Sequence, residues 1–217
     1  MKGVTVGISA KKAAQILYIA FLKIAVKQGD VILEHKIMVA GFGGQGILFL
    51  GKLLAYSGML EGREVTWFPS YGAEVRGGTA NCTVIISDEM IGSPVVRNPE
   101  ILIVMNEASL DKFQPRLKNG GILIFDSSLI KKPELRSDVH VVDVPASEIA
   151  ASIGGTKCAN MVMLSALLAQ TGIIKEESAV NALEELTPQK REKALGANKE
   201  AIVKGRRYIE DKKSKNI

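Results

Sequence analysis

A predicted strand, glycine-rich loop and helix follow one another between Lys36 and Gly62, and this unit constrains the fold more than any other stretch. Four apolar residues at 37–40 suit a strand that is buried on both faces of a sheet. Glycines at 41, 43 and 46 have the G-x-G-x-x-G spacing that turns the backbone sharply into a helix, whose first amides can meet a phosphate. Apolar residues then recur with helical period, and Gly62 suits the end of that helix. The unit predicts an α/β sheet.

The second half of a dinucleotide-binding fingerprint is missing. An acidic residue should close the next strand, where it would hold ribose hydroxyls. The strand predicted over 63–68 instead leads into Ser70 and Tyr71. Two interpretations of the glycines therefore stay open: they bind NAD or FAD, or they only let the strand and helix pack closely.

Length and charge describe an ordinary globular protein. The chain has 217 residues, 47% of them hydrophobic and 24% charged, which is enough for one full α/β domain. Part of the net charge of +5 comes from Lys212, Lys213 and Lys215 in a basic tail over 212–217. No basic stripe is interleaved with aromatic residues, so nucleic acid is not the expected partner.

Two cysteines and two histidines offer little for metal chemistry. Cys82 and Cys158 each lie in an apolar run, and they are too few for a disulfide framework, a structural zinc site or an iron-sulfur cluster. We therefore expect two buried thiols in a reducing cytoplasm. His35 and His140 stand apart from any acidic or cysteine cluster, so we expect no metal site.

The N-terminal extension over 1–33 has no assigned role. Its apolar part at 13–26 is predicted to be helical, but it contains Lys23 and falls short of the ~20 residues of a membrane span. No small-x-small cleavage site follows it, so we expect neither a signal peptide nor membrane attachment.

The rest of the chain alternates strands with helices and ends in helices. The strands are predicted over 80–87, 101–105, 122–126 and 140–144, with 91–96 as a hairpin partner of the first of these. The helices are predicted over 106–117, 145–153, 159–170 and 176–186, followed by a last helix whose start is marked by Thr187 and Pro188. This order predicts an α/β fold with a mainly parallel, mixed sheet flanked by helices, and a helical C-terminal segment.

A second glycine loop over 69–79 carries more chemistry than a connector needs, because it contains a tyrosine, a glutamate and an arginine. Together with the loop at 40–46, with Ile91-Gly92-Ser93-Pro94 and with Asn160-Met161-Val162-Met163-Leu164, it resembles the gamma subunit of the 2-oxoacid:ferredoxin oxidoreductases. The 2-oxoglutarate and 2-oxoisovalerate members are the most similar. The resemblance covers residues 34–211, implies a Rossmann-like domain there, and leaves 1–33 outside.

The resemblance implies an enzyme of several chains that oxidatively decarboxylates a 2-oxoacid with coenzyme A and reduces ferredoxin. Thiamine diphosphate with Mg and the 4Fe-4S clusters would reside on alpha, beta and, where present, delta subunits. This chain would bind none of these cofactors alone. It has no Gly-Asp-Gly motif for the magnesium diphosphate and too few cysteines for a cluster.

The site residues implied for this chain are auxiliary. The residues expected to bind coenzyme A are Gly43, Gly44, Gln45, Gly46, Arg76, Gly77, Gly78 and Thr79. Tyr71 and Glu74 are expected at a subunit interface, and no residue is assigned as a catalytic acid, base or nucleophile. Two alternatives remain: a free-standing NAD- or FAD-binding protein, and a purely structural subunit.

Overall fold

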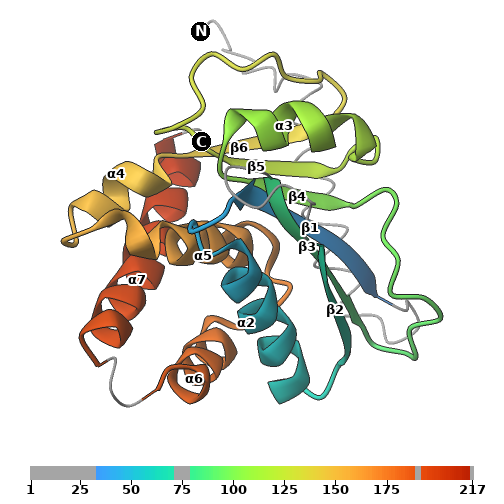
Figure 1. The fold of residues 1–217 in the computed structure, drawn as a ribbon, viewed down its shortest axis with the longest axis horizontal. Helices are drawn as coiled ribbons and strands as arrows, with labels where there is room; N and C mark the ends of the chain where they lie inside the picture. The colour runs from blue at the N-terminus through green and yellow to red at the C-terminus, as the bar shows by residue number, and fades with distance from the viewer. Residues whose placement is uncertain (1–32, 71–78, 189–191, 216–217) are drawn as a thin grey trace, which may run out of the picture.

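The computed structural model describes residues 33–70, 79–188 and 192–215 (Figure 1). In this part of the chain, six strands form one sheet in the order β2-β3-β1-β4-β5-β6. Their bounds are β1 (Glu34–Phe42), β2 (Glu64–Ser70), β3 (Thr79–Ser87), β4 (Ile101–Val104), β5 (Ile122–Asp126) and β6 (His140–Val144). Residues 1–32, 71–78, 189–191 and 216–217 lie outside the described residues. Thr187 and Pro188, expected to begin the last helix, are not helical: Thr187 is extended and ends the helix before it.

Helices cover both faces of the sheet. They are α2 (Ile47–Leu60), α3 (Glu107–Phe113), α4 (Ala146–Ala151), α5 (Ala159–Thr171), α6 (Glu176–Leu186) and α7 (Glu192–Lys215), with short 3-10 turns η1 (Gln114–Arg116) and η2 (Thr156–Cys158). One core joins α2, α5, α6 and α7 to the sheet face that carries Ile37 and Val39. A smaller core joins α3 to the opposite face, which carries Met38 and Ala40. The expectation that residues 37–40 are buried on both faces is confirmed, since none is more than 1% exposed.

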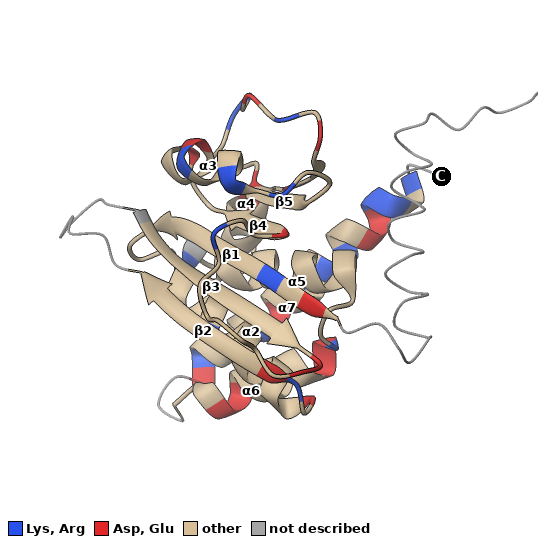
Figure 2. Ribbon diagram, turned by 90° about the vertical axis from the view of Figure 1, so that its right-hand side faces the viewer, with Lys and Arg blue, Asp and Glu red and all other residues tan. Residues whose placement is uncertain are grey.

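The mixed α/β sheet expected from the sequence is confirmed, but the predicted hairpin is wrong. β3 runs antiparallel to both β1 and β2, while β1, β4, β5 and β6 are mutually parallel. Residues 91–96 form no strand. They belong to the connection from β3 to β4, which crosses the sheet face opposite α2 (Figure 2). Of this segment, Val96 is buried while Val95 stays 59% exposed, so its apolar residues reflect one anchor point and not a strand.

Two helix ends match their sequence signals. Gly62 has a φ of 73°, its N–H donates to Met59 O (2.9 Å), and the following N–H of Arg63 reaches Gly58 O (3.0 Å), which is the bonding of a Schellman cap. Gly172, with a φ of 67°, likewise ends α5. α7 continues through Lys215, so residues 212–215 of the expected basic tail are helical.

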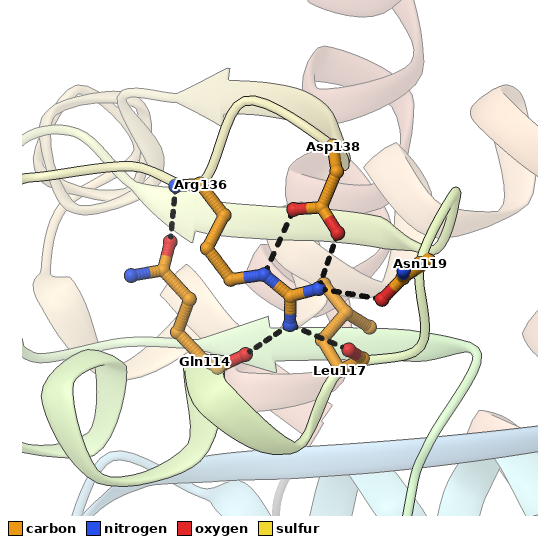
Figure 3. A network of polar contacts seen from close by, with 5 residues as sticks. All are labelled: Gln114, Leu117, Asn119, Arg136 and Asp138. Atoms are coloured by element: carbon orange, nitrogen blue, oxygen red, sulfur yellow. Dashed lines mark hydrogen bonds and ion pairs between the residues drawn. The ribbon is translucent and has the colours of Figure 1, made fainter.

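The long connection from β5 to β6 is held at the amino ends of the strands by Arg136 (Figure 3). Its guanidinium donates to the backbone oxygens of Gln114 (3.1 Å) and Leu117 (2.6 Å), to Asn119 Oδ1 (3.1 Å), and to both carboxylate oxygens of Asp138. The Arg136 hydrogen bonds hold the pKa of Asp138 below its usual range. This network therefore fixes the end of the sheet that lies away from the glycine loop.

Within the described segments, no helix combines the length and the apolar character that a bilayer crossing requires.

Candidate functional site

The candidate site lies at the edge of the sheet where β1, β4, β5 and β6 end. Parallel strands that end together leave their following loops side by side, and open α/β sheets bind ligands at this edge. The loop after β1 leads into α2, and the start of α5 lies against the same loop (Figure 1). At this end of the sheet, α2 lies on one face and α3 on the other.

The loop Gly43–Gly46 adopts a conformation that two of its glycines permit. Gly44 has a φ of 96° and Gly46 a φ of 77°, values that side-chain-bearing residues rarely adopt. Gly43 and Gly44 are exposed. The backbone N–H groups of Gly43, Gly44 and Gly46 have no acceptor among the described residues. The N–H of Gln45 is different, because it donates to Phe42 O (3.2 Å) and closes the turn.

The side chain of Gln45 braces this loop from within. Its Oε1 accepts from the N–H of Phe42 (2.6 Å), and its Nε2 donates to Met105 O (2.8 Å) at the end of β4. Asn106 Nδ2 also donates to Gln45 Oε1 (3.4 Å). Gln45 therefore joins the ends of β1 and β4.

The helices that begin at this edge are capped unequally. Asn106 caps α3, because its Oδ1 accepts from the N–H of Ser109 (2.7 Å). Asp126 at the end of β5 does the same for α4: it is fully buried and accepts from the N–H (3.3 Å) and the hydroxyl (2.6 Å) of Ser147. In contrast, α2 and α5 have neither a side-chain cap nor an acidic residue in the first turn, as far as the described residues show. Uncapped helix N-termini carry a partial positive charge, which favours an anion nearby.

The two uncapped helix starts meet through Asn160, in the first turn of α5. Its Nδ2 donates to Gly46 O (3.2 Å), the carbonyl that also accepts the first intrahelical bond of α2 from the N–H of Leu50 (2.9 Å). The side chain is only 4% exposed. Its Oδ1 is buried and has no hydrogen-bond partner among the described residues.

The second glycine loop starts and ends at the same edge. Thr79, the first residue of β3, pairs with Phe42, and Ser70, the last residue of β2, pairs with Asn81. The ends of the two loops are therefore neighbours across the β1–β3 ladder. The expected binding residues Arg76, Gly77 and Gly78, together with the expected interface residues Tyr71 and Glu74, lie outside the described residues. Of Thr79, only the backbone is described.

Strand order explains why the dinucleotide fingerprint is incomplete. A doubly wound dinucleotide domain has the order 3-2-1-4-5-6, with the acid-bearing second strand beside the first. Here the antiparallel β3 occupies that place, and β2 lies at the sheet edge. The carboxyl end of β2, at Ser70, is thus two strands, roughly 10 Å, away from β1. A carboxylate there would be too far from the loop to serve as the ribose ligand.

Neither thiol is activated. Burial raises the pKa of Cys82 to about 11, and it also raises the pKa of Cys158. Among the described residues, no group of three or more His, Cys, Asp or Glu side chains could hold a metal ion. The site offers backbone donors, helix ends and carboxamides, which suit the binding of an anion better than acid-base or nucleophilic chemistry.

The sequence analysis assigned no site role to Asn106, Asp126 or Asn160. Asn106 could have been found, because it is a polar residue at the start of a predicted helix, where capping side chains are common. Asp126 caps a helix that begins 20 positions later, so it gave no such local signal. Asn160 was named only as part of the resemblance. It stands in an apolar run 114 positions from Gly46, and only the tertiary structure brings the two together.

Comparison with known proteins agrees with the fold and with the resemblance. The family described as pyruvate ferredoxin/flavodoxin oxidoreductase matches residues 36–208. The 2-oxoglutarate synthase subunit KorC of Methanothermobacter thermautotrophicus is 36% identical over 185 residues, which cover 80% of this chain and 98% of KorC. The ketoisovalerate oxidoreductase subunit VorA of the same organism is 39% identical over 180 residues, which cover 82% of this chain but only 37% of VorA. The chain thus spans little more than a third of VorA.

Solved structures lead to the same group. The gamma subunit of a keto/oxoacid ferredoxin oxidoreductase from Geobacter sulfurreducens aligns with a TM-score of 0.71 at 29% identity, covering 81% of this chain and 98% of that subunit. A 2-oxoglutarate:ferredoxin oxidoreductase from Magnetococcus marinus, solved with 2-oxoglutarate, coenzyme A and succinyl-CoA bound, aligns with a TM-score of 0.76 at 27% identity, covering 82% of this chain and 31% of that one. The chain therefore belongs to the pyruvate ferredoxin/flavodoxin oxidoreductase family, and within it to the gamma-subunit group.

Proposed function

We propose that this chain is the gamma subunit of a cytoplasmic, multi-subunit 2-oxoacid:ferredoxin oxidoreductase. The complex would decarboxylate a 2-oxoacid such as 2-oxoglutarate or 2-oxoisovalerate, form the acyl-CoA and CO2, and reduce ferredoxin. Support comes from the nearly full-length match to KorC, a 2-oxoglutarate synthase subunit, and from the match to VorA, a ketoisovalerate oxidoreductase subunit. The two free, buried cysteines suit a reducing compartment.

Other subunits of the proposed complex would hold its cofactors, because this chain lacks the residues that bind them. Two cysteines cannot supply the thiolates of a 4Fe-4S cluster, and the chain has no Gly-Asp-Gly motif for a magnesium diphosphate. Thiamine diphosphate, Mg and the clusters, which supply the carbanion and electron-transfer chemistry when bound, would therefore be held by alpha, beta and possibly delta subunits. The contribution of the gamma chain would be ligand binding and assembly.

The loop Gly43–Gly46 is the proposed contact with coenzyme A, which carries a diphosphate. The observation that carries this proposal is that α2 and α5 are uncapped where they meet at the loop, while α3 and α4 at the same edge are capped. The free amides of Gly43, Gly44 and Gly46 could donate to phosphate oxygens, and Gln45 would hold the loop in shape. The Magnetococcus marinus enzyme, which contains coenzyme A, is a structural neighbour.

We propose that the second glycine loop contacts coenzyme A at the same edge of the sheet. The residues of this loop that would contact the ligand are Arg76, Gly77, Gly78 and Thr79, whereas Tyr71 and Glu74 would contact a partner subunit. The pairing of Thr79 with Phe42 supports this arrangement, since it ties the end of the second loop to the end of β1.

Purification from the native cell under anaerobic conditions tests the whole proposal. The tagged chain should co-purify with alpha and beta chains, and the complex should reduce a viologen dye only with coenzyme A and a 2-oxoacid present. Comparing 2-oxoglutarate, 2-oxoisovalerate and pyruvate would identify the substrate. A chain that purifies alone and binds NAD would refute the proposal.

Gly43→Asp tests the coenzyme A contact. An added Cβ at Gly43 meets nothing within 4 Å, so the variant should fold and place a carboxylate beside the ligand. Repulsion of about 1 kcal/mol between two unit charges near 4 Å in water corresponds to an increase of about fivefold in the KM for coenzyme A. Gly92→Asp, equally open and on the β3–β4 connection, is the matched control and should leave that KM unchanged.

Arg76→Ala separates a binding role from a structural one. A raised KM for coenzyme A in an intact complex would favour binding by Arg76. Loss of assembly without a change in that KM would favour a purely structural subunit.

A further inference from the structure

The side-chain oxygen of Asn160 accepts no hydrogen bond from the described residues. The residue is 4% exposed, and its Oδ1 is buried without a partner among the described residues. Buried side-chain oxygens nearly always accept a hydrogen bond from protein, water or ligand, so an orphaned one calls for an explanation. This oxygen belongs to the side chain that joins the two uncapped helix starts.

The orientation of the carboxamide is fixed by its other end. Nδ2 donates to Gly46 O at 3.2 Å, and rotating the group by half a turn would place two acceptors, Oδ1 and Gly46 O, against each other. The unused atom is therefore the acceptor oxygen. A group that bonds to this oxygen must be a hydrogen-bond donor, whereas the uncapped starts of α2 and α5 beside it favour an anion.

We propose that Asn160 is a specificity-determining residue, whose Oδ1 accepts a hydrogen bond from an N–H or O–H group of the ligand, directly or through one ordered water. The ligand class is then an organic phosphate with an amide or hydroxyl donor close to its phosphates, as opposed to an inorganic anion alone. This inference rests on the proposed binding of coenzyme A at the loop Gly43–Gly46.

The test compares two ligands in the anaerobic, assembled complex. Coenzyme A carries both phosphates and donors, whereas sulfate carries no N–H or O–H group at neutral pH. Asn160→Leu keeps the size of the side chain and removes the acceptor. Calorimetry without 2-oxoacid should show coenzyme A binding weakened about tenfold or more, because a lost hydrogen bond in a buried site is worth a factor of that order. The inhibition constant of sulfate against coenzyme A should stay within about twofold.

Ser165→Ala is the matched control for general damage to α5. Ser165 is as buried as Asn160 and lies on the same helix, but its hydroxyl is satisfied by Ile202 O (2.5 Å). Its loss should lower the melting temperature of the complex and leave the affinity for coenzyme A unchanged.

The outcomes separate the inference from the proposal beneath it. Equal weakening of coenzyme A and sulfate would overturn the inference, because Asn160 would then act only by positioning Gly46. Unchanged binding of both would also overturn it, provided that Gly43→Asp still weakens coenzyme A. If Gly43→Asp has no effect either, the binding role proposed for the loop fails as well.

Discussion

Three alanine substitutions in one loop should separate backbone strain from steric overlap. At Gly43, φ is not left-handed and an added Cβ meets nothing within 4 Å, so Gly43→Ala should stabilise the chain by about 0.4–1 kcal/mol through the unfolded state. Gly44 is equally open but has a φ of 96°, and the left-handed region costs alanine roughly 1–2 kcal/mol. The net loss for Gly44→Ala is then at most about 1.6 kcal/mol.

Gly46→Ala should be the most damaging of the three. Its φ of 77° carries the same strain, and the added Cβ would also overlap the Nδ2 atom of Asn160. Overpacking adds roughly 1–3 kcal/mol, for a net loss of about 1–4.6 kcal/mol. From most to least stable, the order should therefore be Gly43→Ala, wild type, Gly44→Ala and Gly46→Ala.

Thermal and urea unfolding of the purified chain, followed by circular dichroism, would measure this series. For a chain of this size, 1 kcal/mol corresponds to about 2–4 °C in the melting temperature. Equal stability of the Gly44→Ala and Gly46→Ala variants would refute the close contact between Gly46 and Asn160. Equal stability of the Gly43→Ala and Gly44→Ala variants would refute the left-handed conformation at Gly44.

Three further predictions concern packing, thiols and pH. Gly205→Ala would place a Cβ 2.8 Å from the backbone oxygen of Val162 and should destabilise the chain by about 1–2 kcal/mol in urea unfolding. At Gly196 on the same helix α7 an added Cβ meets nothing, so Gly196→Ala should stabilise the chain by up to about 1 kcal/mol. Equal effects of the two substitutions would contradict the close contact between α5 and α7. Because burial raises the pKa of the thiols of Cys82 and Cys158, native chain at about pH 8 should resist iodoacetamide, while unfolded chain should be alkylated at both, as mass spectrometry would show. Burial, and secondarily Arg63, lowers the pKa of His35 from its usual value of 6.5. The unfolded chain therefore binds this proton first as the pH drops, and the stability should fall below about pH 6.5. In the His35→Gln variant the urea midpoint of unfolding should depend less on pH in that range, and an unchanged pH dependence would refute the assignment.

The parts of the fold that the sequence predicted are those that depend on neighbouring residues. A run of four apolar residues at 37–40, glycines at fixed spacing and Gly62 at the helix end act within one strand, one turn and one cap. Local sterics and periodicity decide such features, so the strand, loop and helix could be read before any tertiary contact was known.

The place of β3 could not be predicted in the same way. The apolar residues Cys82, Val84 and Ile86 of β3 all face the larger core. A parallel strand would show the same alternation, so the pattern does not reveal that β3 is antiparallel or which strands it pairs with. The hairpin predicted with residues 91–96 came from β-branched residues near a turn, and it failed because strand pairing is a long-range property. β3 pairs instead with β1 and β2, and through β1 it sets the distance of Ser70 from the glycine loop.

The candidate site was predicted only as far as its backbone. Glycine spacing identified Gly43–Gly46 as a loop of free amides, but the amide of Gln45 is used within the turn and its side chain braces β1 to β4. These uses depend on Met105 and Asn106, which are distant in sequence. Asn160 was recognised as part of a family pattern, and its contact with Gly46 required the packing of α5 against the loop.

The unequal capping of the helices also has an energetic consequence. A side-chain N-cap is worth about 0.5–2 kcal/mol, so leaving both α2 and α5 uncapped forgoes roughly 1–4 kcal/mol that the caps on α3 and α4 secure. An anion bound at the loop would satisfy these helix ends, and its total stabilising effect would be about 2.7 kcal/mol at a ligand concentration of 100 times its Kd. A permanent carboxylate cap at either helix would stabilise the free chain but repel the same anion. Side-chain caps are absent from α2 and α5 as far as the described residues show, whereas Asn106 caps α3 and Asp126 caps α4. This difference is what a chain would show if this edge of its sheet bound a negatively charged ligand.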